Sequence, residues 1–228
     1  MPRETFDREL QRLEDELLVL GSMVESAIAE SVEALKRRDF EASQRIIAAD
    51  KDINAKRFAI ESDVLVLIAT QQPMASDLRA LAAILDLASE LERMGDYAKG
   101  IARINLMIGE EPLMKPLIDI PRMADRACSM LRRALDAFAR RDVDLARAIP
   151  AEDDEIDALY NQVYRELVTY ILADPKHIEQ ANYLLWAAHN LERFADRVTN
   201  ICERVIFTVT GQMREMNVEE KGVENLPG

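Results

Sequence analysis

Apolar residues recur at alternating steps of four and three along the first part of the chain. The stripe begins with Phe6, Leu10, Leu13, Leu17, Leu20 and Val24. This spacing places apolar side chains on one face of an α-helix. It predicts a long amphipathic helix that packs in coiled-coil fashion. We expect the helix to end near Arg37 and Arg38, because cations favour a helix C-terminus.

Two more helices are predicted in the first half of the chain, each bounded by turn residues. One follows Asp39, a residue type that caps helix N-termini, and ends before Pro73. The other begins just beyond this proline and is closed by Gly109, because glycine is common after the last helical turn. Their expected bounds are residues 40–71 and 74–108.

The second half of the chain repeats this plan. The segment Arg38-Asp39 recurs as Arg141-Asp142, 103 positions later. We predict helices over residues 121–140, from about 143 to 173, and from there to Gly211, with Asp174-Pro175 as the last turn. Trp186 and Tyr183 have the spacing of a core face. The expected organisation is a first repeat over residues 1–109, a proline-containing linker over 110–120, a second repeat over 121–211 and a flexible tail over 212–228.

The fold class predicted is all-α, with six long helices in two tandem three-helix bundles related by internal duplication. A repeat of about 100 residues, present twice, favours fused bundles over a solenoid, because solenoids stack shorter and more numerous units.

Net charge and cysteine spacing limit the classes of function that the chain could have. The 228 residues include 42 acidic and 29 basic side chains, for a net charge of −13. A nucleic-acid-binding protein would normally present a basic face, so this class is set aside. Cys128 and Cys202 lack metal-ligand spacing and are predicted to be buried thiols.

The chain contains no apolar run that approaches the length of a membrane-spanning helix. The longest, residues 64–69, has six residues, whereas a spanning helix needs about 20. The first residues are charged and have no apolar signal core. We therefore expect a cytoplasmic protein that reaches a membrane only through a partner.

One hexapeptide occurs twice and carries the candidate chemistry. Leu-Glu-Arg-Met-Gly-Asp ends at Asp96, and Leu-Glu-Arg-Phe-Ala-Asp ends at Asp196, one hundred positions later. Residues four apart lie on the same face of a helix, so Glu92 and Glu192 each share a face with the aspartate that follows. A solvated acidic surface, paired with the arginine inside each copy, is the simplest interpretation of one such motif.

The expected alignment of residues between neighbouring helices strengthens the case for a site at these acidic residues. If helices 40–71 and 74–108 form an antiparallel hairpin about Pro73, facing residues have numbers that sum to about 146. Asp96 then faces Asp50, and Glu92 faces Asn54. An error of one residue in the turn shifts this level by only a fraction of a helical turn.

The second hairpin gives the same result about the turn at residues 174–175. Asp196 faces Asp153, and Glu192 faces Asp157. Unpaired carboxylates meeting in this way raise one another's pKa and destabilise a bundle, whereas a multivalent cation would neutralise them and bridge the helices. Oxygen ligands suit magnesium, calcium, manganese and ferric iron, while zinc usually recruits His or Cys.

Two features bear on this metal hypothesis. Asn54 supplies a neutral carbonyl where the second set has Asp157, which weakens the first site. His189 lies three residues before Glu192 on the same helical face, so it is either a ligand, a hydrogen-bond partner of the site, or a partly exposed histidine.

Over nearly its whole length, from Phe6 to Gly211, the chain resembles the PhoU family, regulators of bacterial phosphate uptake. The most specific parts of the resemblance are Gln72-Pro73-Met74-Ala75-Ser76-Asp77-Leu78-Arg79, the two Glu-Arg-x-x-Asp motifs, Asn200-Ile201-Cys202-Glu203 and Thr210-Gly211. The resemblance implies two three-helix bundles. It also implies metal binding at the positions that match the family's acidic motifs, namely Asp50, Asn54, Glu92, Asp96, Asp153, Asp157, Glu192 and Asp196. Iron, manganese, magnesium and zinc all stay open as the ion.

The function implied by the resemblance is that of a non-enzymatic signalling adaptor. PhoU proteins act with the ATPase of the phosphate-specific ABC transporter and with the sensor histidine kinase PhoR. They hold phosphate-starvation signalling off when phosphate is plentiful, and they restrain uptake. Exposed apolar residues on long helices make a homodimer the expected assembly.

Two alternatives belong to other classes. A di-iron carboxylate enzyme or metal-storage bundle would use Glu-x-x-His motifs, and the chain contains none. A purely structural helical scaffold with solvated acids is the other. No nucleophile with a base and an orienting group can be assembled from the sequence.

Overall fold

The computed structural model describes residues 2–212, and its regular structure there is entirely helical. The long helices are α1 (Pro2–Arg37), α2 (Phe40–Gln71), α3 (Ala75–Ile108), α4 (Asp119–Arg140), α6 (Asp153–Ala173) and α7 (Ile178–Thr210). Short elements complete the second half: α5 (Val143–Ala148) and the 3₁₀ turns η1 (Ile149–Glu152) and η2 (Pro175–His177). None of the described helices is both long and apolar enough to cross a bilayer.

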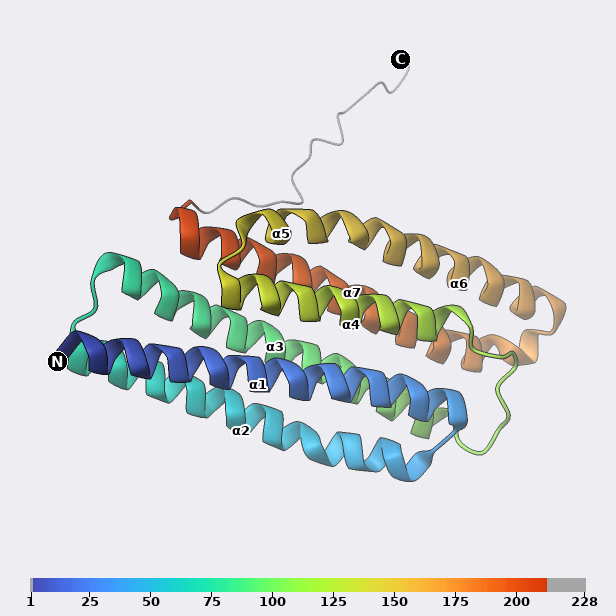
Figure 1. Ribbon diagram of the computed structural model, residues 1–228. Coiled ribbons are helices and arrows are strands. Elements are labelled where there is room, and N and C mark those ends of the chain that lie inside the picture. Colours follow the sequence, from blue (N-terminus) through green and yellow to red (C-terminus); the bar gives the residue numbers. More distant parts are fainter. Residues whose placement is uncertain (1, 213–228) are drawn as a thin grey trace, which may run out of the picture.

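The helices form two three-helix bundles that lie side by side (Figure 1). The blue-to-green helices α1–α3 make the first, and the yellow-green-to-red helices α4–α7 make the second. The bundles meet along α3 and α7 and along α1 and α4. Gly21 allows α1 to approach α4 closely, because a Cβ atom there would overlap the Leu135 side chain at 2.2 Å. The main cluster of buried apolar side chains includes residues of both bundles.

Both halves use the same corner between their first and second long helical segments. Arg38 and Arg141 adopt left-handed backbone conformations, with φ of 58° and 56°. The next residue in each half caps the following helix: Asp39 accepts a hydrogen bond from the Ala42 amide, and Asp142 accepts one from the Leu145 amide. The predicted N-cap at Asp39 is therefore confirmed, and its duplicate behaves in the same way.

The first corner is held by a buried polar network. Asn105 is fully buried on α3, and its amide group donates to the carbonyl oxygens of Ala34 and Asp39 and to the Ser43 hydroxyl. Arg38 reaches the same place and donates to the Asn105 side chain. These bonds tie α3 to the end of α1 and to the start of α2.

Two sequence expectations are wrong. A continuous helix from about 143 to 173 does not form; it is interrupted by η1, because Pro150 lacks an N–H and clashes with the preceding turn of an α-helix. Trp186 does not belong to a core face: it is 53% exposed and packs edge-on against Tyr183 at 5.9 Å. The core face of α7 instead contains Leu184, Ala188 and their helical neighbours.

Other expectations are confirmed. Gly109 closes α3 with a positive φ of 69°. Cys128 and Cys202 are buried, unpaired thiols. The division into repeats at residues 109 and 121 stays a prediction, since helices end near these positions but the core crosses between the bundles. Most of the expected tail lies outside the described residues.

Candidate functional site

The first candidate site lies between α2 and α3, and the structure confirms its predicted register. Lys99 places its Nζ atom 2.7 Å from Oδ2 of Asp50 and 3.2 Å from Oδ1 of Asp96. One ammonium group therefore joins the two helices at the level where Asp50 and Asp96 face each other. Hydrogen bonds to these carboxylates raise the pKa of Lys99, and the bond to Asp50 is the main cause. We call Asp50, Asn54, Glu92 and Asp96 the first cluster.

The remaining members of the first cluster also have partners from the protein. Asn54 donates through Nδ2 to the carbonyl oxygen of Asp50 at 3.0 Å and to its Oδ2 at 3.3 Å. Arg57 lies 3.6 Å from Glu92, measured from Nη1 to Oε2. Burial and the charge of Asp96 raise the pKa of Glu92, and Arg57 opposes this shift. Lys99 thus pairs with two acids of this cluster, and Arg57, which pairs more closely with Glu61 at 2.8 Å from Nε to Oε1, also lies near Glu92.

The second candidate site lies between α6 and α7 and consists of Asp153, Asp157, Glu192 and Asp196, which we call the second cluster. Burial is the main cause that raises the pKa of Asp153 to about 7, and the charges of Asp196, Asp157 and Glu192 add to it. Oδ1 of Asp153 is buried and has no hydrogen-bond partner. Asp153 of α6 is therefore near Asp196 and Glu192 of α7, as the predicted register requires.

The imidazole ring of His189 lies beside this cluster. Its Nδ1 atom lies 3.1 Å from Oε2 of Glu192, although the two atoms are not aligned for a hydrogen bond. The ring is about half exposed and packs at 6.2 Å from the ring of Tyr160. Burial and the charge of Asp196 raise the pKa of Glu192, while His189 opposes the shift.

The duplicated helices show why the two clusters differ. The offset of 100 between α3 and α7 places Thr199 where the first half has Lys99. The offset of 103 between α2 and α6 places Tyr160 at the position of Arg57. Both cations of the first cluster are therefore replaced by neutral residues in the second. The hydroxyl of Thr199 is buried without a hydrogen-bond partner.

The side chains of each cluster can be compared with the ligands that a metal ion requires. In the present side-chain positions, no group of three or more His, Cys, Asp or Glu residues between 2 and 212 could hold a metal ion. The first cluster does not fit one, because Lys99 already occupies the space between Asp50 and Asp96. The second cluster fits better: its donors are all carboxylates, and a buried oxygen of Asp153 lacks a partner. Metal binding there would require these carboxylates to rotate toward one another.

Sequence reasoning missed the residues that neutralise the first cluster. It paired the arginines of the hexapeptides with the nearby aspartates, but Arg93 pairs with Glu90, at 3.2 Å from Nη1 to Oε1. Glu90 also accepts hydrogen bonds from Arg197 and Asn200 of α7, so it belongs to the contact between the bundles. Lys99 lies three residues after Asp96, and this spacing is the signal that could have identified it.

The chain resembles known proteins over most of its length. The PhoU domain family model matches it twice, over residues 17–104 and 120–205. The "Phosphate-specific transport system accessory protein PhoU homolog" of Caulobacter vibrioides is 37% identical over 210 residues, which cover 92% of this chain and 91% of the relative. The accessory protein PhoU of Escherichia coli (strain K12) is 35% identical, over 91% of this chain and 86% of the relative.

Two crystal structures have the same architecture. The phosphate transport system regulatory protein PhoU from Streptococcus pneumoniae superimposes with a TM-score of 0.85 at 34% identity, covering 92% of this chain and all of the other. PhoU from Pseudomonas aeruginosa gives a TM-score of 0.85 at 35% identity, covering 91% of this chain and all of the other.

Proposed function

The chain belongs to the PhoU family, and from this premise we propose that it is an accessory protein of phosphate-specific transport that keeps phosphate-starvation signalling off. The observation that carries the proposal is the match to both PhoU domains, together with relatives named for this transport system over about nine-tenths of the chain. The proposed role is negative regulation of the Pho regulon.

The proposed mode of action is non-enzymatic. The partners we propose are the ATPase subunit of the phosphate ABC transporter and the sensor histidine kinase PhoR. We place the protein in the cytoplasm, where both partners present cytoplasmic surfaces, and we propose a homodimer. Apolar side chains that stay exposed, among them Phe58, Leu65 and Trp186, support a protein contact surface.

The second cluster is the metal site we propose. Asp153, Asp157, Glu192 and Asp196 would hold a multivalent cation that neutralises their charge and ties α6 to α7. A hard ion such as magnesium, manganese or iron suits four carboxylates better than zinc does. The first cluster is held together by Lys99 and Arg57 instead, so we propose that it serves as a structural contact between α2 and α3.

A gene-deletion experiment tests the regulatory role. The gene is deleted in its host, and a reporter of phosphate starvation is measured in phosphate-rich medium. The proposal predicts that the reporter switches on without starvation and is silenced again when the intact gene is returned. A reporter that stays silent in the deletion strain would contradict the regulatory role.

A further inference from the structure

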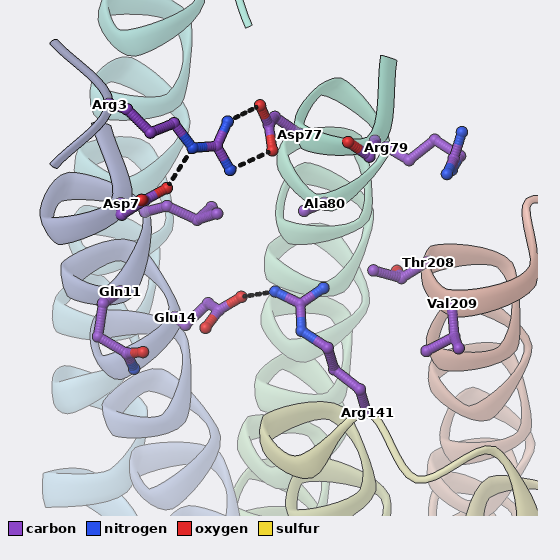
Figure 2. Close-up of a pocket in the computed structure, with 12 residues that line it drawn as sticks. Arg3, Asp7, Gln11, Glu14, Asp77, Arg79, Ala80, Arg141, Thr208 and Val209 are labelled. Atoms are coloured by element: carbon purple, nitrogen blue, oxygen red, sulfur yellow. Dashed lines mark hydrogen bonds and ion pairs between the residues drawn. The ribbon is translucent and has the colours of Figure 1, made fainter. Parts of the chain in front are cut away.

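A cleft opens at the end of the molecule where α1 and α3 begin and where α4 and α7 end (Figure 2). Its volume is about 510 Å³. Three arginines line it, together with carboxylates and hydroxyls: Arg3, Arg79, Arg141, Asp7, Glu14, Asp77, Ser76 and Thr208. The cleft lies away from both acid clusters and includes residues of the Gln-Pro-Met-Ala-Ser-Asp-Leu-Arg segment that begins at Gln72.

Two of the three arginines are neutralised by carboxylates of the cleft. Arg3 lies 2.9 Å from Asp7, and its other end donates to Asp77 at 3.2 Å. Arg141 donates to Glu14 at 3.1 Å. Burial raises the pKa of Glu14, and Arg141 opposes that shift. These pairs account for every carboxylate that lines the cleft.

Arg79 is the exception. Among residues 2–212 no carboxylate pairs with it, and its Nε–H is buried without a hydrogen-bond acceptor. The side chain extends from α3 toward the end of α7 (Figure 2), where its guanidinium carbon lies 3.7 Å from the position that a Cβ on Gly211 would take. A buried donor that lacks an acceptor destabilises the folded state, so an acceptor from outside the chain would be favourable here.

The equivalent corner of the first bundle, around Arg38, is closed by hydrogen bonds within the protein. There Arg38 donates to the carbonyl oxygen of Asn105 at 3.3 Å, to the Asn105 side chain and to the carbonyl oxygen of Gly109. In the second bundle Val205 stands at the position of Asn105, so Arg141 has no such partner on α7 and turns to Glu14 on α1. Arg141 and Glu14 both line the cleft.

We propose that this cleft binds a small tetrahedral oxyanion through Arg79, whose planar guanidinium matches phosphate or sulfate oxygens in a bidentate fashion. Ser76, at the start of α3, also lines the cleft and carries a hydroxyl that can donate a hydrogen bond. Binding here does not depend on the proposed regulatory role, because it is a property of the purified protein. It also differs from binding through a metal, because no residue of either cluster lines the cleft.

The test is calorimetric titration of inorganic phosphate into the full-length protein after its metals have been removed with a chelator, against chloride at equal ionic strength. The wild-type protein should show saturable binding below about 10 mM phosphate. Arg79→Gln should weaken it about tenfold or more, because a charge-assisted bidentate contact is lost. Arg103→Gln is the matched control: Arg103 lies on the same helix, is exposed and lines no described cleft.

The outcomes separate a ligand site from a structural role of Arg79. If Arg79 only stabilises the end of α7, Arg79→Gln will lower the melting temperature while phosphate binds equally to both proteins or to neither, and either result overturns the proposal. Arg79→Lys provides a second variant that keeps the charge. It should fold and still bind phosphate more weakly than the wild type, because the bidentate fork is lost.

Discussion

The Nζ atom of Lys99 lies 2.7 Å from Oδ2 of Asp50, and this contact distinguishes the first cluster from its duplicate, the second cluster. The ammonium group fills the first cluster with the protein's own charge. In the second bundle Thr199 takes the place of Lys99, and the charges of Asp196, Asp157 and Glu192 add to the burial that raises the pKa of Asp153. The duplication therefore keeps acidic residues at matching positions of both bundles, while a lysine joins them in only the first.

Removing the cation from the first cluster should create a second metal site. The double variant Lys99→Thr with Asn54→Asp gives the first cluster the residues that the second cluster has at these positions. We expect it to bind more manganese per chain than the wild type, because oxygen ligands of like charge attract a divalent ion. Elemental analysis after dialysis measures this. Lys51→Thr, at an exposed lysine of α2, is the control, and an unchanged metal content in the double variant would count against the role assigned to Lys99.

The stability of the metal-free protein should depend on pH through Asp153. Its pKa is raised from an ordinary 3.8 to about 7 in the folded state. Between these values the folded protein holds a proton that the unfolded chain has lost, so this group contributes stability below pH 4 that is lost as the pH rises through 7. Asp153→Asn removes the ionisation and should stabilise the metal-free protein by about 1–2 kcal/mol at about pH 8, with little effect at about pH 4.

Urea unfolding at the two pH values measures this difference. Asp144→Asn is the control, because the Asp144 side chain is 98% exposed on α5 and the substitution removes the same charge. An Asp153→Asn protein whose stability follows that of the wild type at both pH values would show that burial does not raise the pKa of Asp153.

Asn105 should be a strong determinant of stability. Its fully buried amide nitrogen joins α3 to the corner between α1 and α2, because its two N–H groups are shared among three acceptors. Asn105→Val, the residue found at the equivalent position of the second bundle, would remove these bonds and one acceptor of Arg38, while the bonds of Arg38 to the carbonyl oxygens of residues 105 and 109 would remain. We expect a loss of about 2–4 kcal/mol in the free energy of unfolding.

Chemical denaturation monitored by circular dichroism checks this value. Asn182→Val on the exposed face of α7 makes the same chemical change without a buried network, and it should alter stability by less than about 0.5 kcal/mol. Equal effects of the two substitutions would mean that the network contributes no net stability.

Helical periodicity and turn residues were sufficient to predict most of the long helices and which acidic residues face each other. Helical periodicity and the turn at Pro73 determine which residues of α2 and α3 are level, and Asp50 and Asp96 are indeed joined through Lys99. The break at Pro150 was missed because a proline near a helix start is tolerated in its first turn, so its effect depends on where the helix begins.

Side-chain partners were harder to predict than backbone register. Lys99 and Arg57 are long and flexible, and the acids they reach depend on neighbouring helices as well as on sequence spacing. Trp186 was assigned to the core on spacing, but the face that α7 buries is determined by contacts with both α3 and α4. The partner of Arg141 was not predicted either: Val205 stands where the first bundle has Asn105, and Arg141 donates to Glu14 of α1 instead.

The difference between the two clusters is tested most directly by manganese binding to three chelator-treated proteins: the wild type, Glu192→Ala with Asp196→Ala, and Glu92→Ala with Asp96→Ala. Equilibrium dialysis gives the amount bound, and circular dichroism confirms that each protein stays helical. We predict that the second-cluster variant loses saturable binding while the first-cluster variant keeps that of the wild type. Binding that survives in the second-cluster variant, or that is lost only in the first-cluster variant, would contradict the assignment of the metal to Asp153, Asp157, Glu192 and Asp196.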